Sequence, residues 1–293
     1  MEKRVTFKGW LLPLCLIAPQ LIISGVFFFY PAGQAVWQSL YIPDPFGLSK
    51  QFVGLGNFEY LFGDKYYRAS FVTTAVFSLL VTLASMLPAL FLAVLADRLI
   101  KGSGAYRTLL IWPYAVAPAV AGVLWLFMFN TRVGVVSWYL GQLGYDWNHV
   151  LNGDEAMGLV VVASAWGRIS YNFLFFFAAL QAVPRSIIEA AAIDGARFWR
   201  RFFTIVLPLL SPTTFFLLVV NVVYAFFETF GVIHTITSGG PQQSTTVLVY
   251  KVFTDGFVGQ DLGSSSAQSV ILLVVVGLLT VLQFKYIEKR VHY

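Results

Sequence analysis

Six long apolar stretches divide this chain of 293 residues and leave few folds open to it. Each approaches the ~20 residues that a helix needs to cross the hydrocarbon core of a bilayer. Backbone groups find no water in that core, so a single segment that crosses it folds as a helix. Charged residues make up only 11% of the chain, whereas they make up roughly 25% of a typical soluble domain. We therefore predict an all-α polytopic membrane protein whose six transmembrane helices lie near Trp10–Tyr30, Phe71–Ala96, Leu109–Phe129, Met157–Leu180, Leu209–Phe230 and Ser269–Tyr286.

Lysine and arginine residues predict the orientation of these helices, because they accumulate in short loops on the cytoplasmic side. With the N-terminus in the cytoplasm, thirteen cations fall on that side and five on the other. We therefore expect both termini and the polar segment 184–208 in the cytoplasm. The cations form no continuous basic face, so the pI of 9.3 does not indicate nucleic-acid binding. The thirteen are Lys3, Arg4, Lys8, Arg98, Lys101, Arg107, Arg185, Arg197, Arg200, Arg201, Lys285, Lys289 and Arg290.

Several motifs that would indicate other functions are missing from the sequence. No lysine is followed by serine or threonine, so the chain has no phosphate-binding P-loop and any ATP hydrolysis is expected in another subunit. The three histidines are far apart and no pattern predicts a metal site. Cys15 is the only cysteine, so no disulfide is expected within the chain. The first apolar run is longer than the about 7–15 residues of a signal peptide, so we expect a retained anchor.

The segment 184–208 is the longest polar interruption on the cytoplasmic side, and its residues predict two short helices. Ser186 followed by Glu189 has the spacing of a capping box, which predicts a helix start. Three alanines follow, and Gly195 provides the left-handed position that ends a helix. The residues 197–203 then combine three arginines with four aromatic side chains. We predict a helix-turn-helix at the membrane surface.

The same segment resembles the EAA loop of permease subunits of ATP-binding-cassette (ABC) importers. In that family the loop is the cytoplasmic coupling helix, which sits in a groove of the ATPase subunit and converts its closure into movement of the transmembrane helices. The resemblance implies the type I ABC importer permease fold. A plainer interpretation is that Glu189 only caps a helix and Gly195 only ends it. The resemblance rests on the matching spacing of the motif residues and assigns ATPase coupling to Glu189, Ala190, Ala191, Asp194, Gly195, Ile205, Leu207 and Pro208.

Further stretches along nearly the whole chain resemble the A-type permease subunits of bacterial sn-glycerol-3-phosphate importers. The resemblance implies translocation of sn-glycerol-3-phosphate, or a related glycerophosphodiester, across the bacterial inner membrane by alternating access. The implied partners are an E-type permease in a heterodimer, two ATPase subunits that bind ATP and Mg, a periplasmic solute-binding protein and membrane lipid. This chain itself is expected to bind no cofactor. The stretches are 18–20, 44–47, 112–118, 145–149, 169–176 and 225–227.

The resemblance also implies a division of the chain into three parts. Residues 1–66 hold the N-terminal tail, the first helix and an external loop, residues 67–287 form a five-helix core with the EAA loop at 184–208, and residues 288–293 form a cytoplasmic tail. The external loop 31–70 is rich in proline and glycine, so we expect it to be irregular and folded against the membrane surface.

Arg168 is the most informative charge, because it lies well inside the fourth apolar stretch. An arginine at the centre of a membrane helix costs ~2.5–3.5 kcal/mol on insertion scales, so it should face a cavity or a partner. Asn172 shares its helical face and Tyr171 lies close to that face. The rigid guanidinium fork suits a carboxylate or a phosphate, so one interpretation is contact with an anionic solute. The other is an internal ion pair, with Glu228 as the candidate acid.

Two further features could contribute to a solute pathway. Asn221 and Glu228 lie about two turns apart on nearly the same face of the fifth stretch. Equally, Glu228 can lie at the membrane interface with its carboxylate in water. Pro88, Pro113 and Pro118 can kink their helices, either where a helix lines the pathway or where small residues pack between helices.

The predicted external loop after the fifth stretch contains the turn Ser238-Gly239-Gly240-Pro241. A Gly-Gly-Pro turn is common at this place in the family that the EAA loop resembles, where the permease meets its binding protein. The β-branched residues Thr245–Tyr250 predict a short strand or a re-entrant edge.

Three other functions remain compatible with the sequence. An ABC importer for a neutral sugar or oligosaccharide would share the loop and the topology. An ion-coupled secondary carrier is a second possibility, although such carriers often contain a repeated pair of halves and this chain shows no repeat. The third is a membrane anchor or sensor without transport.

Overall fold

The computed structural model describes residues 9–44, 48–98 and 103–287. The predicted tail 288–293 lies outside the described residues, as do six of the cations that predict the orientation: Lys3, Arg4, Lys8, Lys101, Lys289 and Arg290. The chain divides into two compact units. Unit 1 comprises Met1–Asp64 and Val252–Leu273, and unit 2 comprises Lys65–Lys251 and Val274–Tyr293.

Unit 1 begins with a long apolar helical run, made of α1 (Leu11–Ser24), the π-helical η1 (Gly25–Phe29) and α2 (Tyr30–Gln38). The run covers 28 residues, and an 18-residue window within it has a mean hydropathy of 2.1, so it is long and apolar enough to cross a membrane. None of its residues is buried within the protein, so its apolar side chains are available to lipid. A helix therefore lies where the first span is predicted, and it continues beyond Tyr30 to Gln38.

The segment after α2 is more ordered than the sequence predicts. Strands β1 (Tyr41–Pro43) and β2 (Lys50–Phe52) form an antiparallel hairpin, and α3 (Gly56–Gly63) follows. The side-chain amide of Asn57 donates hydrogen bonds to the carbonyl oxygens of Ser39, at 2.8 Å, and Tyr41, at 3.1 Å. These bonds join α3 to the hairpin, so the prediction of an irregular loop over 31–70 is wrong.

The later part of unit 1 contains the π-helical η4 (Thr254–Val258) and the start of α15 (Leu262–Leu282). A Cβ atom on Gly263 would lie 2.5 Å from the carbonyl oxygen of Tyr41, so only glycine allows α15 to approach the hairpin this closely. The Ser266 hydroxyl donates to Oε1 of Gln38 at 3.2 Å. Segments far apart in the sequence therefore pack together in unit 1.

Unit 2 is built around three long helices, α4 (Lys65–Arg98), α8 (Gly153–Ala182) and α12 (Ser211–Phe227). Their core places the fully buried alanines Ala89 and Ala93 of α4 in one cluster with Phe173 of α8. Small side chains of this kind let membrane helices approach closely and gain van der Waals contact. The end of α15 and the π-helical η5 (Gln283–Ile287) also belong to unit 2.

Two of the six predicted spans overlap pairs of helices that are bent at a short break, and the second pair begins before the predicted span. The first pair consists of α5 (Ser103–Ile111) with the 3₁₀ segment η2 (Trp112–Ala115), and α6 (Pro118–Met128), and it bends by 102°. In the second pair, α10 (Phe198–Arg201), the π-helical η3 (Phe202–Val206) and α11 (Leu207–Leu209) meet α12 at 66°. In the described residues, four helices are long and apolar enough to cross a membrane, or up to six if each bent pair is one span.

Prolines account for the first of these breaks. Val116 and Ala117 have extended ψ angles of 127° and 139°, and the residue before a proline favours such a conformation. Pro118 then occupies the first turn of α6, where its missing N–H group has no helical partner to lose. The bend predicted at Pro113 and Pro118 is confirmed, whereas α4 continues through Pro88 without a break.

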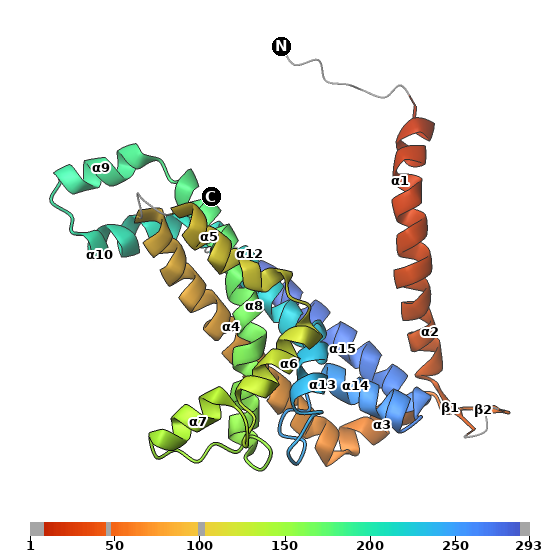
Figure 1. Cartoon of the computed structure of the whole chain (residues 1–293). Helices are drawn as coiled ribbons and strands as arrows, with labels where there is room; N and C mark the ends of the chain where they lie inside the picture. Colours follow the sequence, from red (N-terminus) through yellow and green to blue (C-terminus); the bar gives the residue numbers. More distant parts are fainter. Residues whose placement is uncertain (1–8, 45–47, 99–102, 288–293) are drawn as a thin grey trace. The chain divides into compact units, whose positions relative to one another are not determined.

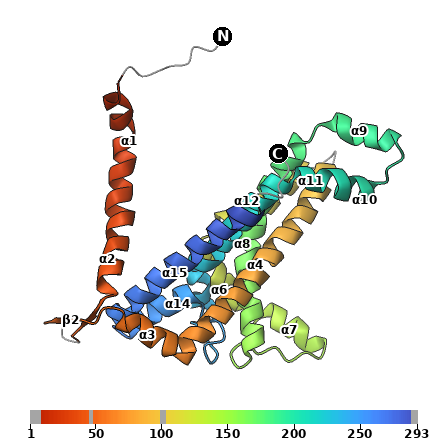
Figure 2. The ribbon, with the colours of Figure 1, turned by 180° about the vertical axis from the view of Figure 1, so that it is seen from behind.

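The two ends of unit 2 carry different structures. Figures 1 and 2 both show α9 (Arg185–Ile193) and α10 at one end and α7 (Val135–Gln142) at the other. Helix α8 connects these ends, and its 30 residues span about 45 Å at about 1.5 Å per residue. The polar turn at α9 and the loop around α7 are therefore separated by more than the hydrocarbon core of a bilayer.

The segment after α12 contains α13 (Phe230–Ile236) and α14 (Leu248–Phe253). The residues Thr245–Tyr250 form no strand, because Thr245 and Thr246 use their side chains and backbone in a tight turn and α14 begins directly afterwards. The prediction of a strand at this place is wrong.

Candidate functional site

Helix α9 begins two residues earlier than the capping-box spacing predicts, because that spacing makes Ser186 the N-cap residue. Pro184 is the N-cap residue, with φ −60° and ψ 122°, and no side chain caps the helix. Ser186 therefore lies inside the first turn, where its hydroxyl cannot serve as an N-cap. The predicted capping box is wrong, and the fixed φ of Pro184 sets the helix start instead.

The end of α9 follows the prediction. Gly195 has a φ of +77°, the left-handed conformation that glycine adopts without strain. Its N–H donates to the carbonyl of Ala192 at 3.1 Å, and the N–H of Ala196 donates to that of Ala191 at 3.0 Å. These two bonds form a Schellman motif, which ends the helix and reverses the chain towards α10.

The residues assigned to ATPase coupling fall into two groups. Glu189, Asp194 and Gly195 are exposed on the α9 turn, as is Ala190, while Ala191 is half-buried. A second group, Ile205, Leu207 and Pro208, lies in η3 and α11, where the chain returns to the bundle, and all three are half-buried. The first group offers a free surface, and the second connects that surface to α12.

Arg201 links the two helices of this turn. Its Nη1 donates to the carbonyl oxygen of Ile188 at 3.3 Å, which ties α10 to α9. Ile188 packs against the bundle core that contains Phe202 and Leu180. A hollow of about 230 Å³ lies beneath the turn, lined by Ile188, Arg201 and Asp97 among others. The turn therefore contacts the bundle at a few points and is otherwise open.

Arg168 is buried near the middle of α8, with 8% of its surface exposed. Its guanidinium carbon lies 4.3 Å from the ring centre of Tyr171 and 4.4 Å from that of Tyr224. Nη2 donates to the carbonyl oxygen of Val220 at 3.3 Å, and the buried Nε has no hydrogen-bond partner. Within the described part of the chain, no ion pair forms between Arg168 and Glu228.

Asn172 and Asn221 are both fully buried and bind each other. Nδ2 of Asn221 donates to Oδ1 of Asn172 at 2.7 Å, and the reciprocal bond measures 3.2 Å. The Ser85 hydroxyl of α4 donates to Oδ1 of Asn221 at 3.2 Å. These three residues are called the amide junction below. The junction joins α4, α8 and α12, and its amide groups are occupied by one another.

A cavity of about 330 Å³ lies beside Arg168 and is called the Arg168 cavity below. Pro113, Tyr114 and Pro118 of the broken helix line it, together with Arg168 and Glu228. Glu228 caps the end of α12 and is exposed. Tyr114 packs against Tyr171, with ring centres 5.7 Å apart. Of the predicted pathway residues, Arg168 and Glu228 line this cavity. Tyr171 contacts Arg168 and Tyr114 without lining it, and Asn172 and Asn221 do not line it either.

The turn at Gly239-Gly240-Pro241 is held by side chains of the following threonines. The Thr246 hydroxyl donates to the Gly239 carbonyl, and the Thr245 hydroxyl donates to that of Gly240, both at 3.0 Å. Gly239 has a φ of +81°, and a Cβ there would lie 2.7 Å from the Tyr250 ring. This loop thus has one defined shape.

The connection from α7 to α8 is organised by Glu155. Its carboxylate accepts hydrogen bonds from the Tyr145 hydroxyl at 2.8 Å and from the Asn148 N–H at 2.6 Å. Burial lowers the pKa of His149 below its usual value, and the nearby Glu155 charge opposes this shift. The hydrogen bond to Glu155 raises the pKa of Tyr145. The side chain of Asn152 caps α8 by accepting hydrogen bonds from the N–H groups of Asp154 and Glu155, so the loop is held where it joins the helix.

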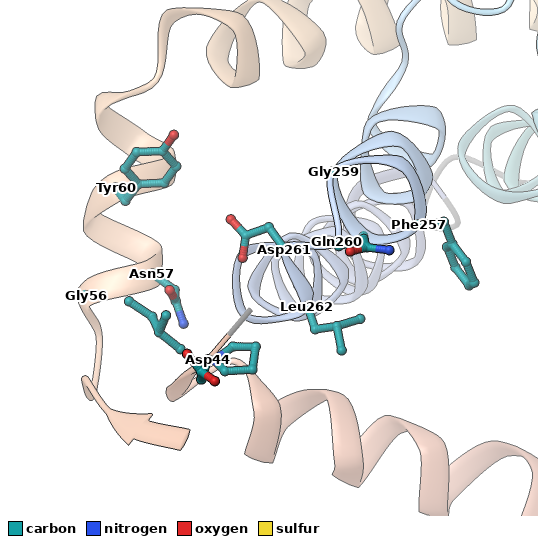
Figure 3. A pocket seen from close by; sticks show the side chains of 12 residues that line it. Asp44, Gly56, Asn57, Tyr60, Phe257, Gly259, Gln260, Asp261 and Leu262 are labelled. Carbon is teal, nitrogen blue, oxygen red and sulfur yellow. The ribbon is translucent and has the colours of Figure 1, made fainter. Parts of the chain in front are cut away.

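Unit 1 has a larger hollow of its own, about 810 Å³, which Figure 3 shows from close by. Asn57 and Tyr60 of α3 lie on one side, and Asp261 lies at the start of α15. The Asp261 side chain accepts a hydrogen bond from the N–H of Ser264 at 3.0 Å and so caps α15. None of the predicted site residues lines this hollow, and no group of three or more His, Cys, Asp or Glu residues in the described ranges could hold a metal ion.

The sequence of residues 60–293 matches the family described as "Binding-protein-dependent transport system inner membrane component". The chain belongs to this family. The family and the apolar helices together make the chain an inner-membrane transport component that crosses the membrane more than once.

Relatives named "sn-glycerol-3-phosphate transport system permease protein UgpA" match along almost the whole chain. The protein of Rhizobium meliloti (strain 1021) is 59% identical over 291 residues, which cover 99% of each chain. That of Brucella suis biovar 1 (strain 1330) is 60% identical over 291 residues, again 99% of each. That of Escherichia coli (strain UTI89 / UPEC) is 58% identical over 292 residues, covering 100% of this chain and 99% of the relative.

Two solved structures share the fold of this family member. A bacterial ABC transporter involved in the import of the acidic polysaccharide alginate has a TM-score of 0.82 at 19% identity, covering 96% of each chain. A bacterial alginate ABC transporter in complex with alginate pentasaccharide-bound periplasmic protein has a TM-score of 0.81 at 20% identity, covering 94% of this chain and 92% of the other. These structures thus share the type I permease fold with this chain, but a sequence identity of 19–20% gives no information about the solute.

Three residues of the two candidate sites were not predicted from the sequence. Tyr224 packs on Arg168, and its spacing of four residues from Glu228 was a signal that it shares that helical face. Ser85 completes the amide junction, and a lone serine in an apolar helix gave no signal of its own. Arg201 was noted only as part of a basic aromatic segment, and its bond to Ile188 needs the folded turn.

Proposed function

We propose that this chain is the permease subunit through which an ABC importer moves sn-glycerol-3-phosphate, or a related glycerophosphodiester, across the inner membrane. The observation that supports the solute is an identity of 58–60% over the full length to proteins named as permeases for it. The alginate importers keep the same fold at 19–20% identity. The threefold higher identity to the glycerol-3-phosphate permeases therefore exceeds what the fold alone requires.

The proposed topology has six spans, with each bent pair counted as one, and both termini in the cytoplasm. Two arguments support it. The distribution of lysine and arginine favours this orientation. The α9 turn, with Arg185, Arg197, Arg200 and Arg201, lies at the end of unit 2 opposite to α7. The chain accordingly has an N-terminal part, 1–66, a five-helix core, 67–287, and a short cytoplasmic tail, 288–293.

The proposed motor is a pair of ATPase subunits that hold ATP and Mg and dock on α9. The exposed face with Glu189, Ala190, Asp194 and Gly195 supports this role, because a helix that contacts its own bundle at few points leaves its surface for a partner. Ile205, Leu207 and Pro208 connect the turn to α12, so movement of α9 reaches the Arg168 cavity through one continuous segment. An E-type permease completes the transmembrane heterodimer.

Transport then follows alternating access. A loaded periplasmic binding protein docks on the outer loops, and ATP binding brings the ATPase subunits together. The α9 turn receives this motion and the pathway opens outward to accept the solute. Hydrolysis returns the permease to the inward-facing state. The pathway residues proposed are Arg168, Tyr171, Asn172, Asn221 and Glu228, with the two asparagines acting as a helix junction rather than as a surface for solute.

Uptake by the complete importer in proteoliposomes tests the solute. We expect ATP-dependent and binding-protein-dependent uptake of sn-glycerol-3-phosphate and none of a maltose-like sugar. Uptake of the sugar alone would assign the chain to a neutral-sugar importer. Uptake that needs no ATP would identify an ion-coupled carrier, and no uptake of any solute would leave an anchor or sensor.

Substitutions in α9 test the coupling. Glu189→Lys and Gly195→Pro should abolish solute uptake while the protein still inserts in the membrane, because the first reverses a charge on the docking face and the second cannot adopt a φ of +77°. Gly195→Asn is the matched control, since asparagine tolerates the left-handed conformation and should retain most of the uptake. Full uptake by Glu189→Lys and Gly195→Pro would contradict the assignment.

A further inference from the structure

The positive charge of Arg168 is incompletely compensated inside unit 2. Only 8% of the residue is exposed, and its polar contacts are one backbone carbonyl and two aromatic rings. The buried Nε makes no hydrogen bond. In the described residues no carboxylate forms an ion pair with it. A buried cation without a counter-charge is unfavourable, so this arrangement favours an anion that arrives from outside the chain.

The broken helix adds a second source of positive potential at the same cavity. Helix α6 has 11 residues and begins at Pro118, and neither its N-cap residue, Ala117, nor any other side chain caps it. The first N–H groups of a helix have no partner within it, and the helix dipole makes this end positive. Pro118 and Ala121 lie one turn apart on the same face of α6, and both line the Arg168 cavity. In other membrane transporters, interrupted helices point such positive ends at anionic groups of the substrate.

Glu228 adds a carboxylate to the lining of the same cavity. Its side chain is exposed, lines the same cavity and forms no ion pair with Arg168 in the described residues. A carboxylate repels phosphate but accepts hydrogen bonds from hydroxyl groups. A cavity of about 330 Å³ lined by both a cation and a hydrogen-bond acceptor fits a small molecule that carries a phosphate and hydroxyl groups.

We infer that the Arg168 cavity is a solute subsite, in which Arg168 and the first turn of α6 bind a phosphate group and Glu228 accepts hydrogen bonds from the solute's hydroxyls. Tyr171 and Tyr224 are positioning residues that hold the guanidinium between α8 and α12. The inference rests on the proposed function, because it assigns roles to residues within the proposed pathway. It predicts that the permease itself selects for an anion, in addition to any selection by the binding protein.

Cysteine chemistry measures the potential in the cavity without relying on transport. Val116 is a half-buried residue of the cavity wall, and Cys15 is the only native cysteine. We would place Val116→Cys in a Cys15→Ser background of the assembled importer and compare an anionic with a cationic methanethiosulfonate reagent, both without nucleotide and with ATP on a hydrolysis-deficient ATPase. We expect the anionic reagent to react about tenfold faster in at least one state.

Three variants and two protecting probes test whether the reagent preference comes from Arg168 and whether a phosphate binds in the cavity. Arg168→Gln should remove the preference for the anionic reagent, and Glu228→Gln should increase it. Arg107→Gln is the matched control, because Arg107 also packs on an aromatic ring, at 4.1 Å from Phe177, but does not line the cavity. Millimolar sn-glycerol-3-phosphate or inorganic phosphate should slow the reaction at Val116→Cys. An equal preference in Arg168→Gln, or no protection by either probe, would overturn the inference.

Uptake separates this inference from the proposed function. The importer without these substitutions should take up sn-glycerol-3-phosphate, and Arg168→Gln should lower uptake at solute concentrations well below saturation by about 10- to 100-fold, as expected for a lost charged hydrogen bond. Arg168→Lys should restore part of it. If the unmodified importer takes up no sn-glycerol-3-phosphate, the proposed solute is wrong. Protection of Val116→Cys by phosphate still tests the subsite in that case. If Arg168→Gln fails to assemble, the inference is tested by whether sn-glycerol-3-phosphate or phosphate protects Val116→Cys in a chain that keeps Arg168.

Discussion

The side chains of Asn172 and Asn221 exchange two hydrogen bonds where neither has any exposed surface. A buried amide that loses its partner keeps the full penalty of leaving water, about 1–3 kcal/mol, whereas a satisfied pair contributes less than that. The amide junction therefore stabilises the bundle chiefly because any movement that separates the two side chains leaves buried amide groups without hydrogen bonds. The hydrogen bond from Ser85 to Asn221 includes α4 in this junction, so separating α4 from α12 also leaves a buried polar group unpaired.

A double-mutant cycle tests this arrangement. Asn172→Ala and Asn221→Ala should each lower the free energy of unfolding by about 1–3 kcal/mol, because each leaves one buried amide unpaired. The double substitution should lower it by less than the sum of the two, with a coupling of about 0.5–3 kcal/mol. Thermal unfolding in detergent measures all three. Additive effects would show that the two side chains act independently.

Gly239 gives a second prediction for a single residue. Gly239→Ala should destabilise the outer turn by about 1–3 kcal/mol, because alanine at a φ of +81° is strained and its Cβ would meet Thr246 and Tyr250. Limited proteolysis across residues 238–246 would measure the effect. Gly141→Ala is the control: Gly141 lies in α7 with no neighbour within 4 Å of an added Cβ, so alanine should be neutral or slightly stabilising there. Equal protease resistance of Gly239→Ala and the parent chain would refute the strain argument.

At the scale of elements, Arg201 determines whether α9 and α10 move as one piece. Arg201→Gln removes the bond to the Ile188 carbonyl and should lower the amount of solute transported per ATP hydrolysed by about 5- to 30-fold, the equivalent of about 1–2 kcal/mol. Arg200→Gln, at the neighbouring exposed position, is the matched control and should keep the ratio. Simultaneous measurement of uptake and ATP hydrolysis in proteoliposomes gives this ratio. An unchanged ratio in Arg201→Gln would remove this contact from the coupling route.

The connection between α7 and α8 should respond to pH through His149. Because burial lowers the pKa of His149 in the folded loop, the unfolded loop binds a proton near its ordinary value of 6.5 while the folded loop does not. The loop is then most stable above that value, loses stability as the pH falls through it, and changes no further below the folded pKa. Hydrogen exchange of residues 144–152, corrected for intrinsic rates, should show more opening at about pH 5.5 than at about pH 7.5. His149→Asn should abolish the difference, and a difference that persists would assign it to another group.

The elements could be predicted from sequence where a local rule sets them. Gly195 indicated the end of α9, and Pro113 and Pro118 indicated the first helix break. The second break, before α12, was missed although Ser211-Pro212 is a typical helix start. Asn172 and Asn221 were predicted as parts of a pathway, but a sequence does not show that two buried faces of different helices meet.

For the whole molecule, apolar length predicted the four helices that are long enough to cross a membrane and the two bent pairs, because bilayer thickness fixes the length of a crossing helix. It did not show the hairpin and α3 of unit 1, whose contacts join residues as far apart as Gln38 and Ser266. Long-range contacts of this kind follow from folding and leave no periodic signal in the sequence. The sequence predicted a cavity beside Arg168 only because a buried charge needs one. It did not predict the lining residues, which come from the broken helix, α8, α12 and α13.

Reaction with a membrane-impermeant thiol reagent tests the orientation of the whole chain. In a Cys15→Ser background, Gln142→Cys at the exposed end of α7 should react in spheroplasts from outside, and Arg197→Cys in the α9 turn should react only after the membrane is opened. The positive-inside distribution of charge predicts this difference. Labelling of Arg197→Cys from outside would reverse the orientation and exclude docking of a cytoplasmic ATPase.

The amide junction constrains how such a molecule can move. Sliding α4, α8 or α12 along a neighbour by even part of a turn would separate donors from acceptors that have no water to replace them. Tilting the three together keeps every bond. We therefore expect this trio to swing as one rigid body during each cycle, with the bending concentrated at the two breaks, one before α6 and one before α12.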